Sequence, residues 1–426
     1  MAKKNYRPET LALHAGQEPD EATLSRAVAV YRTTAYNFKS AKHAADLFAL
    51  KERGNIYSRL MNPTNDVLEK RLAALEGGVG ALSLASGTAA IAFTITNILR
   101  ASDELVAANN LYGGTYTQFE SILPQFGIRT HFTPVNDFAQ VEAAINERTR
   151  AIYIETLGNP ALDVADIEGY SKIAKRHHIP LIVDATFTPP TLIKSIDCGA
   201  NIVIHSLSKW IGGHGTAIGG AVIDAGNFDW SDKKFALYNE PDSGYHGMRF
   251  AHDLGELNNQ AFILRLRTVG LRNLGPTLSP DSAWIFLQGL QSLPLRIRRH
   301  SENALEVAKF LKSHKRVDWV RYPGLPGDPS YPLAKKYLKN GFGGVVVFGV
   351  KGGYEAAIRV VDNISLFSNV ANVGDSKSLI LHPASTSHGQ LSAERQAQGG
   401  LTPELLRLSI GLENVEDIKE ALDEVL

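Results

Sequence analysis

Cysteine is almost absent from this sequence, because Cys198 is the only one in 426 residues. A single cysteine excludes an internal disulfide and any metal site built from several cysteines, so we expect no metal centre. Chains without disulfides are typical of reducing compartments. The first ten residues also lack the apolar core of a signal peptide. Both features predict a cytoplasmic protein.

Net charge and long hydrophobic runs are also missing. Lys and Arg total 44, and Asp and Glu total 44, so the formal net charge is zero. Such a chain has no global positive field to attract nucleic acid or an anionic membrane. No uninterrupted apolar run reaches the ~20 residues that a membrane-spanning helix needs. We therefore expect neither nucleic acid nor a membrane as a partner.

The composition that remains is ordinary, with 44% hydrophobic and 21% charged residues, and it suits a globular chain of two or three domains. Between residues 61 and 285, short apolar runs alternate with helical stretches, which predicts a large α/β domain with a mostly parallel sheet. The predicted strands are 80–85, 104–107, 128–133, 151–154, 180–184 and 200–204.

The two ends of the chain have different sequence patterns. Residues 1–60 lack clear periodicity, and we expect an N-terminal arm that packs on a neighbouring subunit and contributes to its site. Residues 286–426 mix predicted strands at 343–350, 364–367 and 378–381 with helices at 354–361 and 415–425. This irregular mixture predicts a smaller α+β domain at the C-terminal end.

Polar or glycine residues follow five of the predicted strands: Gly87, Tyr112, Asn159, Asp184 and Lys209. Taken singly, each is as well explained by a turn, by packing or by a solvated loop. Ligands of parallel α/β sheets bind outside the carboxyl ends of the strands, where all five would meet. Their convergence predicts a ligand site at that edge.

Lys209 is the centre of this predicted site. It comes just after a buried strand, and burial lowers the pKa of a lysine, which suits an amine that acts as a nucleophile. Ser206 and Ser208 flank it and could hydrogen-bond a phosphate. The backbone amides of Gly87 and Thr88 open a helix, where phosphates also bind.

Arg407 alternates with apolar neighbours on a predicted strand, so it is expected to be half buried and to need an anion. A ligand carboxylate and an internal acid are both possible partners. An imine-forming Lys209, a strand-end Asp184, an aromatic Tyr112, phosphate donors and Arg407 together suit pyridoxal phosphate (PLP). Asp184 would keep its pyridine nitrogen protonated so that the ring can accept electrons.

With these residues in place, the chain resembles the Cys/Met-metabolism family of PLP-dependent enzymes. The likeness covers nearly the whole length, from Tyr57-Ser58-Arg59 through Asp184 and Ser206-Leu207-Ser208-Lys209 to Leu406-Arg407-Leu408-Ser409. It implies the aspartate-aminotransferase-like fold, called fold type I, and PLP as the cofactor. It also implies a homo-oligomer, usually a tetramer formed by paired dimers.

The resemblance assigns roles by matching position. Lys209, Tyr112 and Asp184 are expected to be catalytic, as the Schiff-base lysine, the ring-stacking tyrosine and the partner of the ring nitrogen. The other expected cofactor contacts are Gly87, Thr88, Asn159, Thr186, Ser206 and Ser208, with Tyr57 and Arg59 reaching the phosphate of the adjacent subunit. The expected substrate contacts are Arg407, Asn372, Asn159 and Tyr57.

Departures from the family pattern narrow the expected activity. Gly114 stands where methionine γ-lyases carry a reactive cysteine, and Ala371 stands where cystathionine-handling relatives often have Glu. Ala185 and Thr88 replace a usual Asn and Met. The long segment 226–260, the stretch Gly374-Asp375-Ser376-Lys377-Ser378-Leu379-Ile380 and His382-Pro383-Ala384-Ser385-Thr386 are similar to O-acetylhomoserine sulfhydrylases.

This likeness implies γ-replacement on O-acetyl-L-homoserine, in which sulfide gives homocysteine and methanethiol gives methionine. The choice between the acetyl and succinyl esters stays open. Cystathionine γ-synthase and γ-lyase activities stay open as alternatives within the family. A catalytically silent binding subunit is a further alternative, against which the intact Lys209, Asp184 and Arg407 argue.

Overall fold

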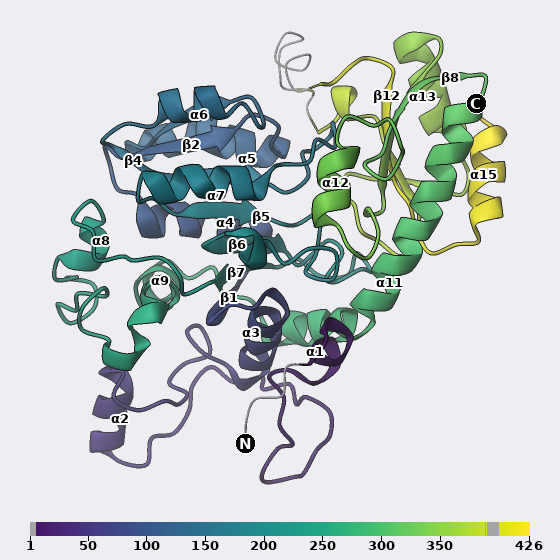
Figure 1. Ribbon diagram of the computed structural model, residues 1–426. Coiled ribbons are helices and arrows are strands. Elements are labelled where there is room, and N and C mark those ends of the chain that lie inside the picture. The colour runs from purple at the N-terminus through teal and green to yellow at the C-terminus, as the bar shows by residue number, and fades with distance from the viewer. Residues whose placement is uncertain (1–5, 388, 390–399) are drawn as a thin grey trace.

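Two β-sheets organise the computed structural model, which describes residues 6–387, 389 and 400–426 (Figure 1). The larger sheet has seven strands in the order β1-β7-β6-β5-β4-β2-β3, and the second has five in the order β10-β11-β12-β9-β8. The chain thus has the expected α/β class, with a large sheet and a smaller one. Residues 1–5 of the predicted arm lie outside the described residues.

The larger sheet is mostly parallel, as predicted. Only β7 runs antiparallel to its neighbours β1 and β6, while β3, β2, β4, β5 and β6 pair in parallel. The strands are β1 Gly80–Leu84, β2 Glu104–Ala108, β3 Arg129–Thr133, β4 Thr149–Glu155, β5 Leu181–Asp184, β6 Ile202–Ser206 and β7 Gly220–Asp224.

Helices cover both faces of this sheet because its strands are apolar on both sides. One core contains Ile154 and Val183, and the other contains Tyr153 and Ile182 from the opposite faces of the same strands. The surrounding helices include α3 Pro63–Glu76, α4 Gly87–Ile98, α5 Gly113–Thr117, α6 Phe138–Ala144 and α7 Ile167–Arg176. This arrangement buries the strands and leaves their carboxyl ends for polar groups.

A long helix, α11 Pro280–Ser313, runs from the larger sheet to the second sheet (Figure 1). It begins at the Ser279 cap, whose hydroxyl accepts the backbone N–H of Ser282 at 3.1 Å, and it continues through Pro294. The predicted domain boundary at 285/286 falls inside this helix. The domain limits therefore stay a prediction.

The second sheet contains β8 Val317–Arg321, β9 Val345–Val350, β10 Ser368–Asn369, β11 Leu379–Leu381 and β12 Leu405–Ser409. It packs against α11 and α13 Gly353–Asn363. The helix α15 Val415–Asp423 packs on α11 and shares a hydrophobic core with β9, and the short helix α12 Tyr331–Tyr337 lies between β8 and β9 in the sequence. The strand predicted at 364–367 is wrong, because α13 continues to Asn363 and the pairing begins only at Ser368. The sequence interpretation missed β8 and α12.

The N-terminal arm and the segment 226–260 each contribute residues to one of the two cores that flank the larger sheet. In the arm, α1 Pro8–His14 packs on α3 and α11, whereas α2 Ala41–Phe48 lies well away from α1 (Figure 1). The irregular segment 226–260 contains the short helix α8 Ala236–Asn239. Trp230 of this segment stacks on Phe262 at 5.6 Å between ring centroids, so the segment is packed rather than loose.

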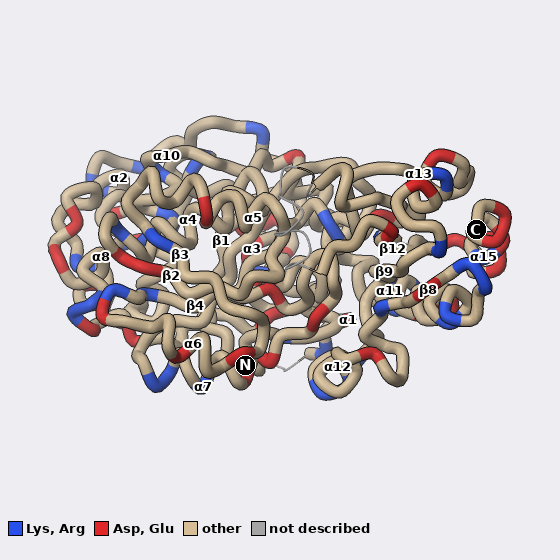
Figure 2. The backbone as a smooth tube through the Cα atoms, turned by 90° about the horizontal axis from the view of Figure 1, so that it is seen from above, with Lys and Arg blue, Asp and Glu red and all other residues tan. Residues whose placement is uncertain are grey.

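Charges are spread without a dominant sign. Figure 2 shows acidic and basic positions interspersed along the backbone of both halves of the molecule, which agrees with the net charge of zero. Among the described residues, no helix is long and apolar enough to cross a membrane.

Candidate active site

A cavity of about 610 Å³ lies at the carboxyl ends of the larger sheet, where the second sheet meets it. Both halves of the chain line it. It brings together most of the residues predicted from the sequence: Gly87, Thr88, Tyr112, Asn159, Asp184, Thr186, Ser206, Ser208, Lys209, Asn372 and Arg407. Residues from five strand ends therefore converge, as expected.

Lys209 sits in a tight turn that directly follows β6. The N–H of Gly213 bonds to the Lys209 carbonyl at 2.8 Å, and the buried side chain of Trp210 anchors the turn in the core. Arg296 of α11 donates to the carbonyls of Trp210 and Ile211 at 2.8 and 3.2 Å. These contacts hold the backbone of Lys209 while its amine reaches into the cavity.

The amine of Lys209 contacts the loop between β10 and β11 of the second sheet. Its Nζ donates to Oδ1 of Asn372 at 2.6 Å. Burial, reinforced by the positive charge of Arg407, lowers the pKa of Lys209 to about 8. Neutral amine is therefore accessible near neutral pH, which is the form that attacks an aldehyde or accepts a proton.

The loop that carries Asn372 is held against the lysine turn by a glycine. Gly374 has φ +80°, and a Cβ there would lie 2.6 Å from the backbone nitrogen of Trp210. The N–H of Gly374 also bonds to the hydroxyl of Ser409 on β12 at 2.9 Å. A side chain at 374 would push the two parts of the site apart.

Arg407 is a buried cation that has no acidic partner among the residues that the structure describes. Its side chain is on β12, the residue is 5% exposed, and burial lowers its pKa to about 10. It donates to Oδ1 of Asn159 at 3.0 Å and to the carbonyl of Asn372 at 3.3 Å. No carboxylate of the described residues pairs with Arg407. Of the two partners that the sequence left open, these residues therefore provide no internal acid, whereas a ligand carboxylate could bind to the guanidinium.

Asp184 ends β5 and is 8% exposed. Its carboxylate accepts the backbone N–H of Thr186 at 2.9 Å and the hydroxyl of Tyr153 at 3.2 Å. Burial raises the pKa of Asp184, while these donors oppose the rise. A positively charged ring nitrogen opposite this carboxylate would favour its ionised form further.

Tyr112 precedes α5 at the mouth of the cavity and is 47% exposed. Its backbone N–H bonds to Oε1 of Glu155 at 2.7 Å. A Cβ at Gly114 would lie 2.5 Å from Cε1 of the Tyr112 ring. Gly114 therefore lies against the ring instead of lining the cavity, and its lack of a side chain sets where that ring can lie.

The start of α4, where it lines the cavity, is suited to an anion. The first N–H groups of α4, including those of Gly87 and Thr88, have no partner inside the helix. Ser206 lies next to this helix start, since a Cβ added at Gly87 would be 2.7 Å from the Cβ of Ser206. The hydroxyl of Ser208 lines the cavity but already bonds to Gly219, accepting its N–H at 3.0 Å.

Tyr57 and Arg59 do not belong to this cavity within one chain. Tyr57 is 39% exposed. Arg59 donates to the carbonyl of Arg272, and its guanidinium carbon lies 5.4 Å from the centre of the Tyr57 ring. The two residues form a neighbouring pair on the arm, outside the site of their own chain.

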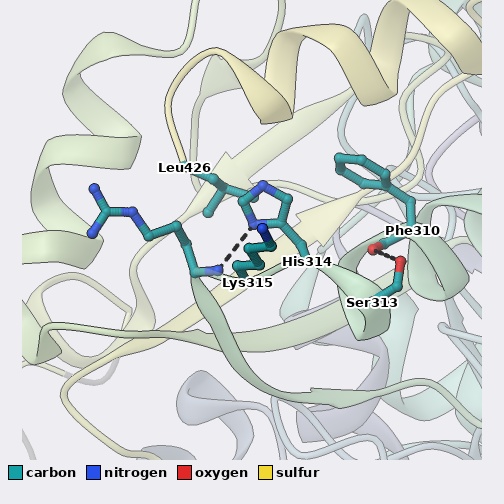
Figure 3. Close-up of a pocket in the computed structure, with 6 residues that line it drawn as sticks. Phe310, Ser313, His314, Lys315 and Leu426 are labelled. Carbon is teal, nitrogen blue, oxygen red and sulfur yellow. Dashed lines mark hydrogen bonds between the residues drawn. The ribbon is translucent and has the colours of Figure 1, made fainter.

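A second hollow of about 620 Å³ lies at the far end of α11 (Figure 3). Phe310, Ser313, His314, Lys315, Arg316 and Leu426 line it. His314 is already engaged, with Asp423 at 3.2 Å. No lining side chain among these six is buried, so the polar groups there remain solvated.

The residues of the first cavity fit PLP. Its lining includes a helix start that can bind an anion, a buried carboxylate, an aromatic ring and an amine of lowered pKa. The sequence interpretation missed Glu155, which also lines this cavity. Its position after the hydrophobic run of β4 was the available signal.

Comparison with known proteins supports this interpretation. The family model of Cys/Met metabolism PLP-dependent enzymes matches residues 9–426. The chain is 52% identical to an O-acetyl-L-homoserine sulfhydrylase of Leptospira meyeri, covering 99% of this chain and 97% of that protein. It is 51% identical to O-acetyl-L-homoserine sulfhydrylase 1 of Thermus thermophilus, covering 99% and 100%.

A solved structure is also similar. It is described as an O-acetylhomoserine (thiol)-lyase from Campylobacter jejuni, and it contains a pyridoxyl-lysine monophosphate residue. The TM-score is 0.95 at 42% sequence identity, and the match covers 99% of each chain. The expected fold type is therefore confirmed.

Proposed function

The chain belongs to the Cys/Met-metabolism family of PLP-dependent enzymes, and we propose that it replaces the acetyl ester of O-acetyl-L-homoserine with sulfide. The Cγ–O bond of the ester breaks and a Cγ–S bond forms, giving L-homocysteine and acetate. Methanethiol in place of sulfide would give L-methionine. The names of the Leptospira and Thermus relatives support this choice of substrate.

One observation carries the proposal at the level of geometry. The buried guanidinium of Arg407 has no acidic partner among the described residues, and Asn372 connects it to the amine of Lys209. A buried arginine binds a carboxylate through paired hydrogen bonds. An amino-acid substrate held there by its α-carboxylate would place its Cα beside the Lys209 amine.

The cofactor contacts follow from the same cavity. Ser206 and the amides of Gly87 and Thr88 would hold the phosphate, with Thr186 and Ser208 beside it. Asp184 would face the ring nitrogen and Tyr112 the ring plane, with Asn159 at the cofactor edge. When bound, PLP supplies an aldehyde that captures amines and a ring that withdraws electrons from Cα.

Lys209 supplies the proton transfers. Its amine, with a pKa near 8, is basic enough to remove the Cα proton and acidic enough to return a proton later in the reaction. The Oδ1 atom of Asn372 accepts its hydrogen bond and limits the directions in which the amine can point. Arg407 fixes the substrate during these transfers.

The part of the cavity beside Asn372 is consistent with a small incoming nucleophile. Ala371 lines the cavity beside Asn372 and adds only a methyl group. A neutral wall of this kind gives no charged contact for a second amino acid, whereas sulfide needs none. This supports sulfide over cysteine as the acceptor.

A direct assay tests the activity. The purified protein with PLP is incubated with O-acetyl-L-homoserine and sulfide, and homocysteine and acetate are measured. The O-succinyl ester, cysteine and methanethiol are compared under the same conditions. Absence of homocysteine from either ester would refute the proposal. Cystathionine formation or 2-oxobutanoate release at a higher rate would favour the synthase or lyase alternative.

Tyr57 and Arg59 support a shared site between two subunits. Both lie outside the cavity of their own chain, on an arm that leaves Tyr57 39% exposed. We propose that they contact the cofactor phosphate and, through Tyr57, the substrate of a neighbouring subunit. A tetramer made of two such dimers and a cytoplasmic location remain predictions of the sequence.

Hybrid enzymes test the shared site. Arg59→Ala and Lys209→Ala each remove one contribution and should inactivate the homo-oligomer. Mixed oligomers of the two variants should regain activity, because one site in each mixed dimer combines an intact Lys209 with an intact Arg59. If each site used only its own chain, the mixture would show no more activity than the separate variants.

A further inference from the structure

Glu155 is an acid in the cavity to which neither the sequence interpretation nor the proposed reaction assigns a role. It is the last residue of β4 and is 6% exposed. In the parallel pairing of β4 with β5, Glu155 is the register partner of Asp184. Side chains at paired positions lie on the same face of a sheet, so the two acids face the same space.

When two buried acids lie this close together, the negative charge on one raises the free energy needed to ionise the other. Asp184 receives two donors, the N–H of Thr186 and the hydroxyl of Tyr153. Glu155 receives one, the N–H of Tyr112. Arg407 and Lys209 also line the cavity, and His205 on β6 favours the charge on Asp184. Burial and the nearby Asp184 raise the pKa of Glu155 well above its usual range. Of the two acids, Asp184 is therefore the one whose surroundings favour the ionised form more.

Glu155 also fixes the residue expected to stack on the cofactor. Its Oε1 accepts the backbone N–H of Tyr112 at 2.7 Å, immediately before the start of α5. Gly114 leaves room for the ring of Tyr112 on the other side. The backbone of Tyr112 is thus tied to β4, next to the strand that carries Asp184.

We propose that Glu155 is a positioning residue which, as a neutral carboxylic acid, holds Tyr112 in place without competing with Asp184 for the positive charge of the cofactor ring. The proposal rests on PLP binding as described above. It requires a hydrogen-bond acceptor at position 155 and no negative charge. Glutamine meets both requirements, whereas methionine has a similar volume and meets only the second.

Cofactor binding by the apoenzyme tests this. The dissociation constant of PLP is measured by equilibrium dialysis, and the orientation of the bound ring is followed by its visible circular dichroism. We expect Glu155→Gln to stay within about threefold of the wild-type dissociation constant and to keep the dichroic band. Glu155→Met should weaken binding about tenfold and reduce the band, because the N–H of Tyr112 loses its acceptor.

Asp224→Asn is the matched control. Asp224 is another buried acid that accepts backbone N–H groups, at the opposite end of the sheet, and burial raises its pKa to about 7. Its substitution should leave PLP affinity and the dichroic band unchanged. Thermal unfolding of each apoenzyme separates a loss of folded protein from a loss of affinity.

Three results would overturn the proposal. Unchanged binding by Glu155→Met would show that no acceptor is needed, and weak binding by Glu155→Gln would show that the charge is needed. Equal weakening by Asp224→Asn would show an effect unrelated to the cavity. Failure of the wild-type protein to bind PLP would instead refute the proposed function, so the two failures are distinguishable.

Discussion

Two hollows in the described part of this protein have nearly the same size, about 610 Å³ at the sheet edge and about 620 Å³ at the end of α11. They differ in what is buried. The first contains Lys209, Asp184, Glu155 and Arg407 in places where solvent cannot stabilise their charges, so their pKa values shift. The second is lined by Lys315 and Arg316, which are exposed. Desolvated groups that converge, more than volume, distinguish an active site.

The sharpest way to test this contrast is to remove one amine from each hollow. Lys209→Ala should lower kcat by at least ~10³-fold, because both the cofactor attachment and the proton carrier are lost. The purified variant should also lack the visible colour of covalently bound PLP. Lys315→Ala is the matched change in the far hollow and should leave colour and kcat unaltered. A coloured, active Lys209→Ala variant would contradict the assignment of the site.

The cation expected to bind substrate provides the next test. Arg407→Lys keeps the charge but loses the paired donors, and we expect KM for O-acetyl-L-homoserine to rise by about 10–100-fold. PLP affinity should change little, since the variant acts on the substrate contact. Steady-state kinetics and equilibrium dialysis measure the two quantities. An unchanged KM would mean that the α-carboxylate binds elsewhere.

A smaller effect is expected in the pH dependence of PLP capture by the apoenzyme. The neutral amine reacts, so the rate should rise with pH and level off above the Lys209 pKa of about 8. An exposed lysine would continue to gain rate up to about pH 10.4. Stopped-flow absorbance gives the profile. Arg407→Met should move the midpoint to higher pH, because the positive charge of Arg407 is one cause of the lowered pKa.

The smallest effect is expected at the far hollow itself. Arg316→Ala removes an exposed side chain from a wall in which His314 is already engaged with Asp423. Stability should change by no more than about 0.5 kcal/mol, and kcat and KM should stay at wild-type values. Chemical denaturation and the homocysteine assay measure these. A large loss of activity would show that this hollow contributes to the reaction after all.

Part of the site follows from local sequence patterns. Apolar β-branched runs predict buried strands, and the residues that follow those strands lie at one edge in any parallel sheet. This is why Gly87, Asp184 and Lys209 could be placed together before the fold was known. The strand at Ser368–Asn369 was misplaced because only two residues pair there, too few to leave a periodic signal.

Other parts depend on register and on contacts between distant residues. The alignment of Glu155 with Asp184 comes from the pairing of β4 with β5, and one residue of slippage would turn one acid to the other face. The pairing of Lys209 with Asn372 joins residues 163 positions apart. Periodicity within a short window contains no information about either.

The amino-acid sequence was enough to identify the kind of chemistry: an amine after a buried strand, an acid at the end of another, a helix that begins at a glycine and an arginine among apolar neighbours. Residue type and local period are sufficient for that. The packed fold was needed to show that Arg407 has no acidic partner among the described residues, that Glu155 lies on the same sheet face as Asp184, and that Arg59 lies outside the cavity of its own chain. Burial and pairing are properties of the whole packed chain, and they set the charge of each group.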